Sequence, residues 1–359
     1  MKRTARPRYR EIHPGIFMIR LPLAGKRPGP INAYFFTGET PALVDTGTRR
    51  TARILEKALG DIGYSFRDIR RIVITHGHVD HYGAARRIAR AAGSRVEVAA
   101  HEADRTPIER GLEVPRSRFL GYYRLMGVPF LFKLSLLPMR LLFSSLAENC
   151  PVDRFISDGE TVRLGDYNAT VIATPGHTKG SVSLYLEREG ILFPGDHILG
   201  HITPNAFVML DEEFDLPRRM SQVEFYNSLA IIEKLAPGMV FPAHGEPIED
   251  VGAIITMFRE QFALRRERIM KILVKGEFTA YRIARLLFPE IRGVRLPLEI
   301  YLAVSEVYTH IQVLLDDGAV TRRMENGALL FRAGPVKGPG PEAPEKNIFT
   351  GTSRREGLS

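Results

Sequence analysis

The sequence predicts an α+β protein in which mixed sheets are covered by helices, followed by a smaller C-terminal module. Three observations favour this fold class. The chain has 359 residues, of which 44% are apolar and 25% charged, so it can bury a full core. Short apolar runs alternate with amphipathic helical patterns through the first 257 residues. From about residue 258 the pattern changes to three helices and a hairpin, which predicts a second domain.

The first part of the chain alternates predicted strands with predicted helices. Apolar runs bounded by turn residues predict strands at 31–37, 41–45, 69–75, 96–100, 167–173, 181–186, 190–194 and 239–242. Amphipathic spacing predicts helices at 49–59, 81–92 and 221–235. Gly93 follows the second of these helices and is a typical C-terminal cap residue. Helices placed between strands in this way cover the faces of the sheets.

An apolar insertion, residues 105–148, interrupts this alternation. It is rich in Leu, Phe, Tyr and Met, but two prolines and the charges of Lys133 and Arg140 exclude a stable membrane span. We expect short helices that lie over a cleft, make peripheral contact with a membrane surface, or pack against their own domain. Tyr122 and Tyr123 in this insertion are candidate substrate contacts.

Three helices and a hairpin predict a winged-helix domain at residues 258–333. The helices are expected at 261–274, 279–288 and 298–315, and the strands at 320–323 and 329–332. Glu325-Asn326-Gly327 between the two strands is a typical hairpin turn. The third helix carries Glu where a DNA-reading helix would carry Arg or Lys, so we expect a cap or a homodimer contact. Residues 334–359 are rich in Gly, Pro and Glu and are expected to be a disordered tail.

The composition of the chain indicates which cellular compartment and which classes of partner to expect. Lys and Arg exceed Asp and Glu by 50 to 41, and the net charge of +9 allows nucleic acid, acyl-carrier phosphates or membrane surfaces as partners. The single Cys150 excludes an intramolecular disulfide framework, and the chain starts without a signal-peptide pattern. We therefore expect a cytoplasmic protein in which Cys150 is an ordinary buried or half-buried thiol and any metal ligands are His and carboxylates.

The strongest functional signal is the run HGHVDH at residues 76–81, between a predicted strand and a predicted helix. In an extended segment His76 and His78 point to the same side. Asp80 and His81 begin the next helix and can turn toward a neighbouring position. Imidazole suits zinc and iron, and a carboxylate can bind one ion or bridge two. The run therefore predicts two adjacent metal sites.

Four more candidate residues each follow an apolar strand and lie among turn residues. They are Asp45 in ALVDTG, His177 in TPGHT, Asp196 in LFPGD and His244 in FPAHG. Ligands on loops at strand ends can converge on one edge of a sheet while the core stays apolar. Five such segments in one chain predict a common site.

In their chain order, from Asp45 through the 76–81 run to His244, these five segments resemble the motifs of the metallo-β-lactamase-fold hydrolases over residues 10–255. The resemblance implies an αββα sandwich with a metal site on one edge. The implied ligands are His76, His78 and His177 for one metal, Asp80, His81 and His244 for the second, and Asp196 bridging the two. The resemblance also implies that Asp45 supports the site through hydrogen bonds. The C-terminal helices and hairpin resemble the winged-helix domain of the lactamase-beta-2-like proteins, a branch of this superfamily.

This resemblance implies a hydrolase with two divalent metal ions, for which zinc is expected and iron or manganese are alternatives. A metal-bound hydroxide would attack a carbonyl or phosphoryl centre, and Asp80 could also take up a proton. His197 and His201, which come shortly after Asp196, are candidates for substrate binding or proton donation, or are structural histidines.

The substrate is less constrained than the reaction. The apolar insertion would supply the wall that an acyl chain needs, so we expect a small hydrophobic thioester, ester or lactone. An RNA or phosphodiester hydrolase is the alternative, because the chain is basic and some lactamase-beta-2-like proteins act on RNA. A non-catalytic winged-helix binding protein is a third hypothesis.

Overall fold

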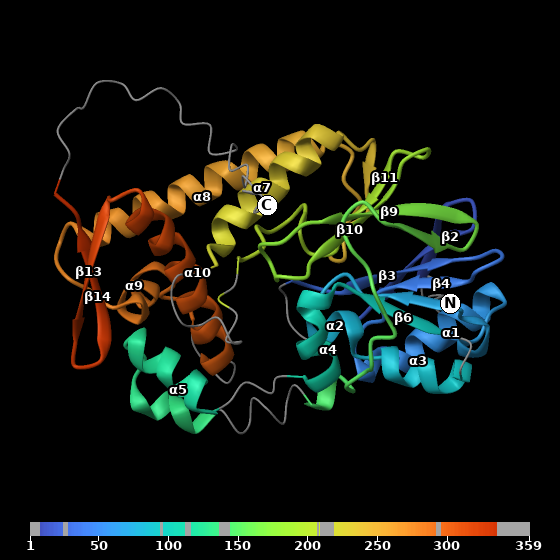
Figure 1. Cartoon of the computed structure of the whole chain (residues 1–359), viewed down its shortest axis with the longest axis horizontal. Coiled ribbons are helices and arrows are strands. Elements are labelled where there is room, and N and C mark those ends of the chain that lie inside the picture. The colour runs from blue at the N-terminus through green and yellow to red at the C-terminus, as the bar shows by residue number, and fades with distance from the viewer. Residues whose placement is uncertain are drawn as a thin grey trace, which may run out of the picture.

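The computed structural model describes residues 8–23, 28–93, 96–111, 116–135, 144–206, 208, 219–291 and 296–335. The predicted tail lies outside the described residues from 336 onward, as do parts of the predicted insertion at 112–115 and 136–143. The described residues form a β-sandwich and a C-terminal module of helices and a hairpin. Helix α8 (Val251–Leu273) runs from one to the other (Figure 1).

Two sheets of described residues form the sandwich. The first contains, in spatial and chain order, β1 (Tyr9–His13), β2 (Ile16–Leu21), β3 (Ile31–Phe36), β4 (Ala42–Val44), β5 (Arg71–Val73), β6 (Glu97–Ala100) and β7 (Arg154–Phe155). The second contains, in spatial order, β12 (Met239–Val240), β11 (Ile191–Phe193), β10 (Val182–Leu186), β9 (Tyr167–Ala173) and β8 (Thr161–Leu164). Neighbours from β4 to β7 are parallel, as are β11 and β12, and the other neighbours are antiparallel.

Strand β3 shows why both faces of the first sheet are apolar. Its alternate residues Ile31, Ala33 and Phe35 belong to the core cluster on the outer face of the sheet. Tyr34 and Phe36 point the other way, into the cluster between the two sheets. All six side chains of this strand are buried, so the strand lies inside a layered structure and not at a surface.

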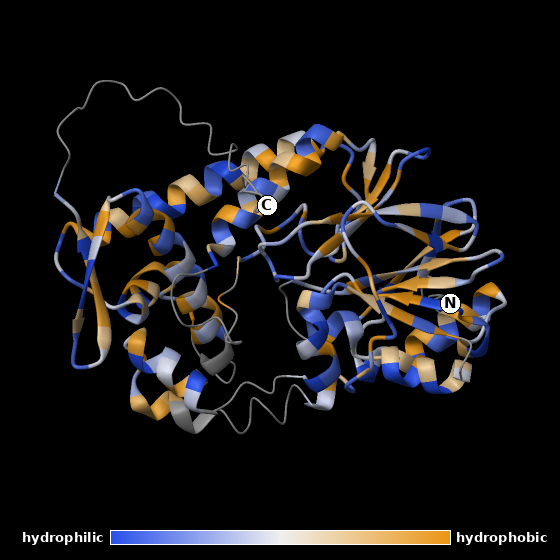
Figure 2. Cartoon of the chain, in the orientation of Figure 1, coloured by the Kyte–Doolittle hydropathy of each residue, from blue (hydrophilic) through white to orange (hydrophobic). Residues whose placement is uncertain are grey.

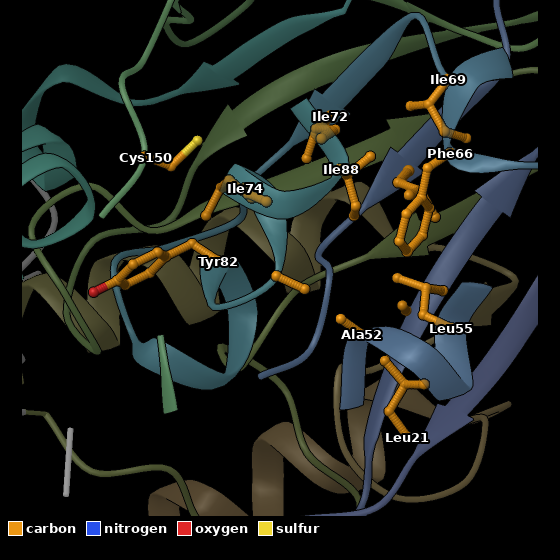
Figure 3. Packing of buried hydrophobic residues seen from close by; sticks show 14 of the residues in the cluster. Leu21, Ala52, Leu55, Phe66, Ile69, Ile72, Ile74, Tyr82, Ile88 and Cys150 are labelled. Atoms are coloured by element: carbon orange, nitrogen blue, oxygen red, sulfur yellow. The ribbon is translucent and has the colours of Figure 1, made fainter. Parts of the chain in front are cut away.

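Helices cover the outer faces of both sheets and complete the αββα layers. The sandwich helices are α1 (Ala52–Ile62), α2 (Val79–Tyr82), α3 (Ala85–Ala92), α4 (Arg105–Arg110) and α7 (Ser221–Leu235). Leu55 of α1 and Ile88 of α3 pack in the outer cluster of the first sheet (Figure 3). Phe225 of α7 and Phe258 of α8 pack with Leu192 on the second sheet. The predicted α+β fold class and the implied αββα sandwich are confirmed.

The single cysteine lies in the outer core cluster of the first sheet (Figure 3). Cys150 is fully buried, and burial raises the pKa of its thiol to about 12. A buried thiol with a raised pKa carries almost no thiolate at neutral pH and is a poor nucleophile. The prediction of a buried structural cysteine is confirmed.

The C-terminal module contains the second half of α8, then α9 (Ala280–Leu287), α10 (Leu296–Asp316), β13 (Val320–Glu325) and β14 (Ala328–Ala333). This is the predicted order of elements, while the identification as a winged helix stays a prediction. Asn326 and Gly327 have φ angles of 51° and 78°, as a two-residue type I′ hairpin turn requires. Helix α8 begins at Val251 and not at the predicted residue 261, so one continuous helix crosses the expected domain boundary.

The insertion divides between the two parts of the molecule. Ile108 of α4 packs in the sandwich core, as expected for packing against its own domain. Helix α5 (Arg116–Leu125) instead contributes Tyr122 and Tyr123 to the core of the C-terminal module. Figure 1 shows α5 beside α9 and the hairpin, and Figure 2 shows apolar residues recurring along α5, α8 and α10. None of the described helices combines the length and the apolar composition that a membrane span requires.

Candidate metal centre

Each candidate residue lies on a loop, or on the first turn of a helix, that follows a strand of the sandwich. Asp45 follows β4, the 76–81 run follows β5, and His177 follows β9. Asp196 and His244 follow β11 and β12. The structure brings these loops together, and with them all seven predicted ligands: His76, His78, Asp80, His81, His177, Asp196 and His244.

Three histidines and an aspartate form the first group of ligand atoms. His78 Nδ1 lies 2.9 Å from His76 Nε2 and 3.1 Å from His177 Nε2. Asp196 Oδ2 lies 3.5 Å from His177 Nε2 and 3.9 Å from His76 Nε2. Each residue of the group offers one ligand atom within 4.8 Å of the others, so the group could hold one ion.

Asp80, His81 and His244 form the second group. His244 Nε2 lies 3.5 Å from Asp80 Oδ2. Asp196 Oδ1 lies 3.6 Å from His81 Nε2 and 3.5 Å from His244 Nε2. The two carboxylate oxygens of Asp196 therefore face different groups, which is the arrangement that a bridging carboxylate needs.

Two buried nitrogens of the second group and the Asp196 oxygen that faces them have no hydrogen-bond partner among the described residues: His81 Nε2, His244 Nε2 and Asp196 Oδ1. Asp196 Oδ1 is 3.5–3.6 Å from the two nitrogens, which is too far for a good hydrogen bond. Leaving a buried polar atom without a partner costs about 1–3 kcal/mol. A divalent cation would satisfy all three atoms, so this donor set fits a metal ion.

The two groups differ in the protonation of their histidines. Burial lowers the pKa of His76 well below its usual value and that of His177 to about 4, so both rings are neutral and offer lone pairs. Burial also acts to lower the pKa of His81, but the carboxylates of Asp45 and Asp196 outweigh it and raise this pKa. The second group therefore favours positive charge. Without a metal ion, protons on its histidines supply this charge, and a bound metal ion would supply it instead.

The carboxylates of Asp80 and Asp196 are ionised at neutral pH. Burial acts to raise the pKa of both groups. The neighbouring rings of His244 and His81 outweigh burial, lowering the pKa of Asp80 to about 2 and that of Asp196 well below its usual range. About 15% of the Asp80 side chain is exposed, so this carboxylate also has access to solvent.

Asp45 lies behind the ligands and orients His81. Its Oδ2 accepts hydrogen bonds from His81 Nδ1 and from the Thr75 hydroxyl, both at 2.8 Å. Its Oδ1 accepts from the Thr75 backbone N–H at 2.9 Å. The Asp45 backbone has a φ of 59°, a left-handed conformation that is strained for a residue other than glycine. A hydrogen bond at Nδ1 leaves Nε2 as the ligand atom of His81.

Main-chain carbonyls orient two more histidines. His177 Nδ1 donates to the Asn205 carbonyl oxygen at 2.8 Å, and His244 Nδ1 donates to the Pro30 carbonyl oxygen at 3.0 Å. These partners are 28 and 214 residues away in the chain. Because every residue has a carbonyl group, no sequence signal could have identified them.

A buried aspartate that the motifs do not predict connects two ligand loops. Asp104 is fully buried, and its Oδ2 accepts from the Gly77 N–H at 2.7 Å and from the Thr178 hydroxyl at 2.6 Å. Its Oδ1 accepts from the Gly180 N–H at 2.8 Å. Gly77 lies in the 76–81 run and Thr178 directly follows His177, so Asp104 holds both loops. Its position shortly after a predicted strand was the available signal.

The predicted substrate contacts lie in different environments. Tyr122 and Tyr123 are fully buried in the core of the C-terminal module. His197 is also fully buried, with its ring centroid 4.4 Å from that of Phe225, and burial lowers its pKa to about 3. These three predictions are corrected, because a buried packing position leaves no surface for a substrate. His201 is exposed, and its Nε2 donates to a main-chain carbonyl oxygen at 2.8 Å.

A family model for the metallo-beta-lactamase superfamily matches residues 27–244, and the chain belongs to this family. It is 27% identical over 311 residues to the probable metallo-hydrolase YqjP of Bacillus subtilis, covering 85% of this chain and 93% of that protein. A crystal structure of a metallo-beta-lactamase family protein from Thermus thermophilus superposes with a TM-score of 0.76 at 25% identity. That match covers 90% of this chain and all of the other.

Two other relatives match over less of their length. A beta-lactamase-like protein 2 homolog of Caenorhabditis elegans is 26% identical over 261 residues, which is 71% of each chain. An atrochrysone carboxyl ACP thioesterase of Aspergillus fumigatus is 29% identical over 118 residues, which is 33% of this chain and 25% of that protein. The family match and the metallo-hydrolase relative together support a metal-dependent hydrolase.

Proposed function

We propose that this protein is a binuclear metal-dependent hydrolase of thioesters or related esters. The position of Asp196 carries the proposal, because its two oxygens face two separate groups of ligand atoms at 3.5–3.9 Å. Two divalent ions, when bound, would lower the pKa of the water that they share and polarise the scissile carbonyl group. Zinc is the expected metal, and iron or manganese would suit the same donors.

Side chains of this protein would bind the two ions, orient their ligands and transfer the proton. The residues that would hold the first ion are His76, His78 and His177, those that would hold the second are Asp80, His81 and His244, and Asp196 would contact both. Asp45 keeps His81 in the tautomer that presents Nε2 to the site. Asp80 is ionised and partly exposed, so it can take up a proton and return it to the leaving group.

A surface hollow beside the His177 loop supports a carrier-linked substrate. It has a volume of about 590 Å³, within the usual range for ligand sites, and its lining includes Ala103, Pro175, Lys179, Arg219 and Glu224. Pro175 and Lys179 each lie two residues from His177 in the chain. Arg219 and Glu224 form an ion pair at 2.7 Å, and Lys179 adds a second cationic side chain. The lining therefore carries one more positive than negative charge, which would suit an anionic group such as the phosphate of a coenzyme A or acyl-carrier thioester. The thioesterase relative supports the same reaction class.

The predicted RNA hydrolase is less well supported. Helix α10 would be the reading helix of a winged-helix domain, yet no residue from 299 to 315 is exposed. A helix enclosed by its neighbours cannot enter a groove of a nucleic acid. RNA therefore serves as the comparison substrate in the test of this proposal.

Initial rates on acyl-coenzyme A thioesters of increasing chain length would test the proposal. We expect hydrolysis that is lost after chelation, restored by zinc, and faster with longer acyl chains. The matched comparison is a 5′-labelled RNA under the same conditions. Chelator-sensitive cleavage of RNA with no thioester hydrolysis would overturn the thioester assignment and leave the metal centre intact. No metal-dependent activity on either substrate, with zinc bound, would remove the support for a hydrolase of these classes.

A further inference from the structure

The segment that follows His201 joins the metal centre to the C-terminal module. The Asn205 carbonyl oxygen accepts the hydrogen bond from His177 Nδ1 at 2.8 Å. The next residue, Ala206, is buried in the cluster that packs on the second sheet. Val208, two residues further, packs against the core of the C-terminal module. Asn205, which contacts His177, and Val208, which contacts the C-terminal module, are therefore only three residues apart in the chain.

Helix α10 holds this segment by its main chain. The Ser305 hydroxyl oxygen accepts a hydrogen bond from the Val208 N–H at 2.7 Å, and the Tyr301 hydroxyl donates to the Val208 carbonyl oxygen at 2.8 Å. Ser305 is fully buried, and Tyr301 lies four residues earlier on the helix, so both side chains project from one face. Both polar groups of the Val208 peptide backbone are thereby fixed by the C-terminal module.

An ion pair of the same helix adds a third contact to the segment. Glu306 Oε1 lies 2.9 Å from Arg265 Nε of α8, and only 15% of the Glu306 side chain is exposed. Burial raises the pKa of Glu306, while the charge of Arg265 and a hydrogen bond from the Asn205 side chain oppose that rise. The residue whose carbonyl group orients His177 is thus also contacted through its side chain.

We infer that helix α10 of the C-terminal module positions the metal ligand His177. The hydrogen bonds of Tyr301 and Ser305 hold Val208, which lies three residues after Asn205 in the chain and therefore restrains the position of the Asn205 carbonyl group. That carbonyl group keeps the proton of His177 on Nδ1 and the lone pair of Nε2 toward the metal site. Tyr301 and Ser305 are positioning residues, because neither touches the ligand atoms. The inference rests on the metal binding proposed above, but not on the substrate class.

Cobalt(II) binding to the full-length, chelator-stripped protein tests this inference without a substrate. The variant Tyr301→Phe/Ser305→Ala removes both hydroxyl groups that hold Val208. We expect one cobalt-binding step to weaken, with the about 10–100-fold effect of losing a group that contacts a ligand directly as the upper bound. The absorption bands of the cobalt bound in that step should also change. The other binding step should keep the wild-type affinity.

Tyr308→Phe is the matched control. Tyr308 lies on the same helix, but it packs toward Phe331 of the hairpin, with ring centroids 6.2 Å apart. Its cobalt affinities and spectrum should equal those of the wild type. Tyr301→Phe alone should show a smaller shift in the same direction, and it replaces the double variant where that variant does not fold.

Three results would overturn the inference. Wild-type affinities and spectra in folded Tyr301→Phe and double variants would show that α10 does not influence His177. Equal weakening in the control would show that the module only stabilises the fold. A wild-type protein that binds no cobalt, zinc, iron or manganese would overturn the proposed metal function together with this inference, and that outcome is distinct from the other two.

Discussion

The β-sandwich and the C-terminal module are assembled from the sequence in different ways. In the first sheet the spatial order of the seven described strands is their order in the chain. The core of the module instead combines α5, residues 116–125, with the second half of α8 and the elements that follow it. The sandwich carries all seven candidate ligands, whereas the module holds, through α10, the segment that orients one of them. Local motifs thus define the chemistry, and contacts between distant segments support it.

The largest expected effect is on the sandwich side of this comparison, at Asp196. Asp196→Ala should lower the hydrolysis rate by more than about 100-fold, because removing a ligand exceeds the about 10–100-fold cost of removing a group that supports one. Steady-state rates and bound metal per chain would measure it. Asp61→Ala is the control, since Asp61 forms only an exposed i,i+4 ion pair with Lys57 among the described residues. Full activity of Asp196→Ala would contradict its bridging position.

A smaller loss is expected at Asp104, which supports the ligand loops from within the sandwich. Asp104→Asn keeps the shape of the side chain but replaces one of its two acceptor oxygens with an NH2 donor. At least one of the three donors that the carboxylate now accepts from would then face another donor. We expect about 10-fold weaker metal binding and a similar fall in kcat. Metal release to a chelator, followed over time, would measure the first effect. Unchanged release and kcat would mean that the loops hold their geometry without Asp104.

Gly176 tests how tightly the His177 loop is packed. Its φ is +133°, and an added Cβ would lie 2.5 Å from the Phe225 Cα. Gly176→Ala should therefore lower the free energy of unfolding by about 1–3 kcal/mol, through backbone strain and overpacking. Urea denaturation of the metal-free protein would measure it. Wild-type stability would show that α7 can move away from the loop without cost.

The smallest effect is expected in the module, at Gly121. This residue lies inside α5, and an added Cβ would meet nothing within 4 Å. Gly121→Ala should raise the free energy of unfolding by about 0.5–1 kcal/mol, because alanine loses less backbone entropy than glycine in a helix. Metal binding should be unchanged, as urea denaturation and zinc titration can show together. A loss of stability would be inconsistent with the helical packing of α5.

More of the sandwich than of the module could be predicted from the sequence, because local patterns specify its strands. Apolar runs such as 31–37 identify buried strands, and Asn326-Gly327 identifies a hairpin, because each pattern acts locally. Strand β1, with the sequence YREIH, is a half-exposed edge strand and shows no apolar run. The partner of α5 could not be predicted, because an apolar helix face does not specify which other surface covers it.

The ligands of the site could be predicted, while most of their supports could not. The ligands can be recognised from the sequence alone, because they are His and Asp residues that lie at the ends of predicted strands. The Asn205 and Pro30 carbonyl groups cannot be recognised in this way, because every residue has a main-chain carbonyl group. His197 shows the opposite error: it is next to Asp196 in the chain, yet its side chain points into the core. Neighbours along a loop can face opposite sides, so adjacency does not predict a role.

Counting the metal ions tests the central claim most directly. Zinc titrated into the chelator-stripped protein, with a chromophoric chelator as competitor, would give both the number of ions and their affinities. We predict two ions per chain in the wild type, with both binding steps weakened in Asp196→Ala because that carboxylate faces both groups of ligand atoms. One ion per chain, or two ions whose affinities do not change in Asp196→Ala, would contradict a bridged binuclear site.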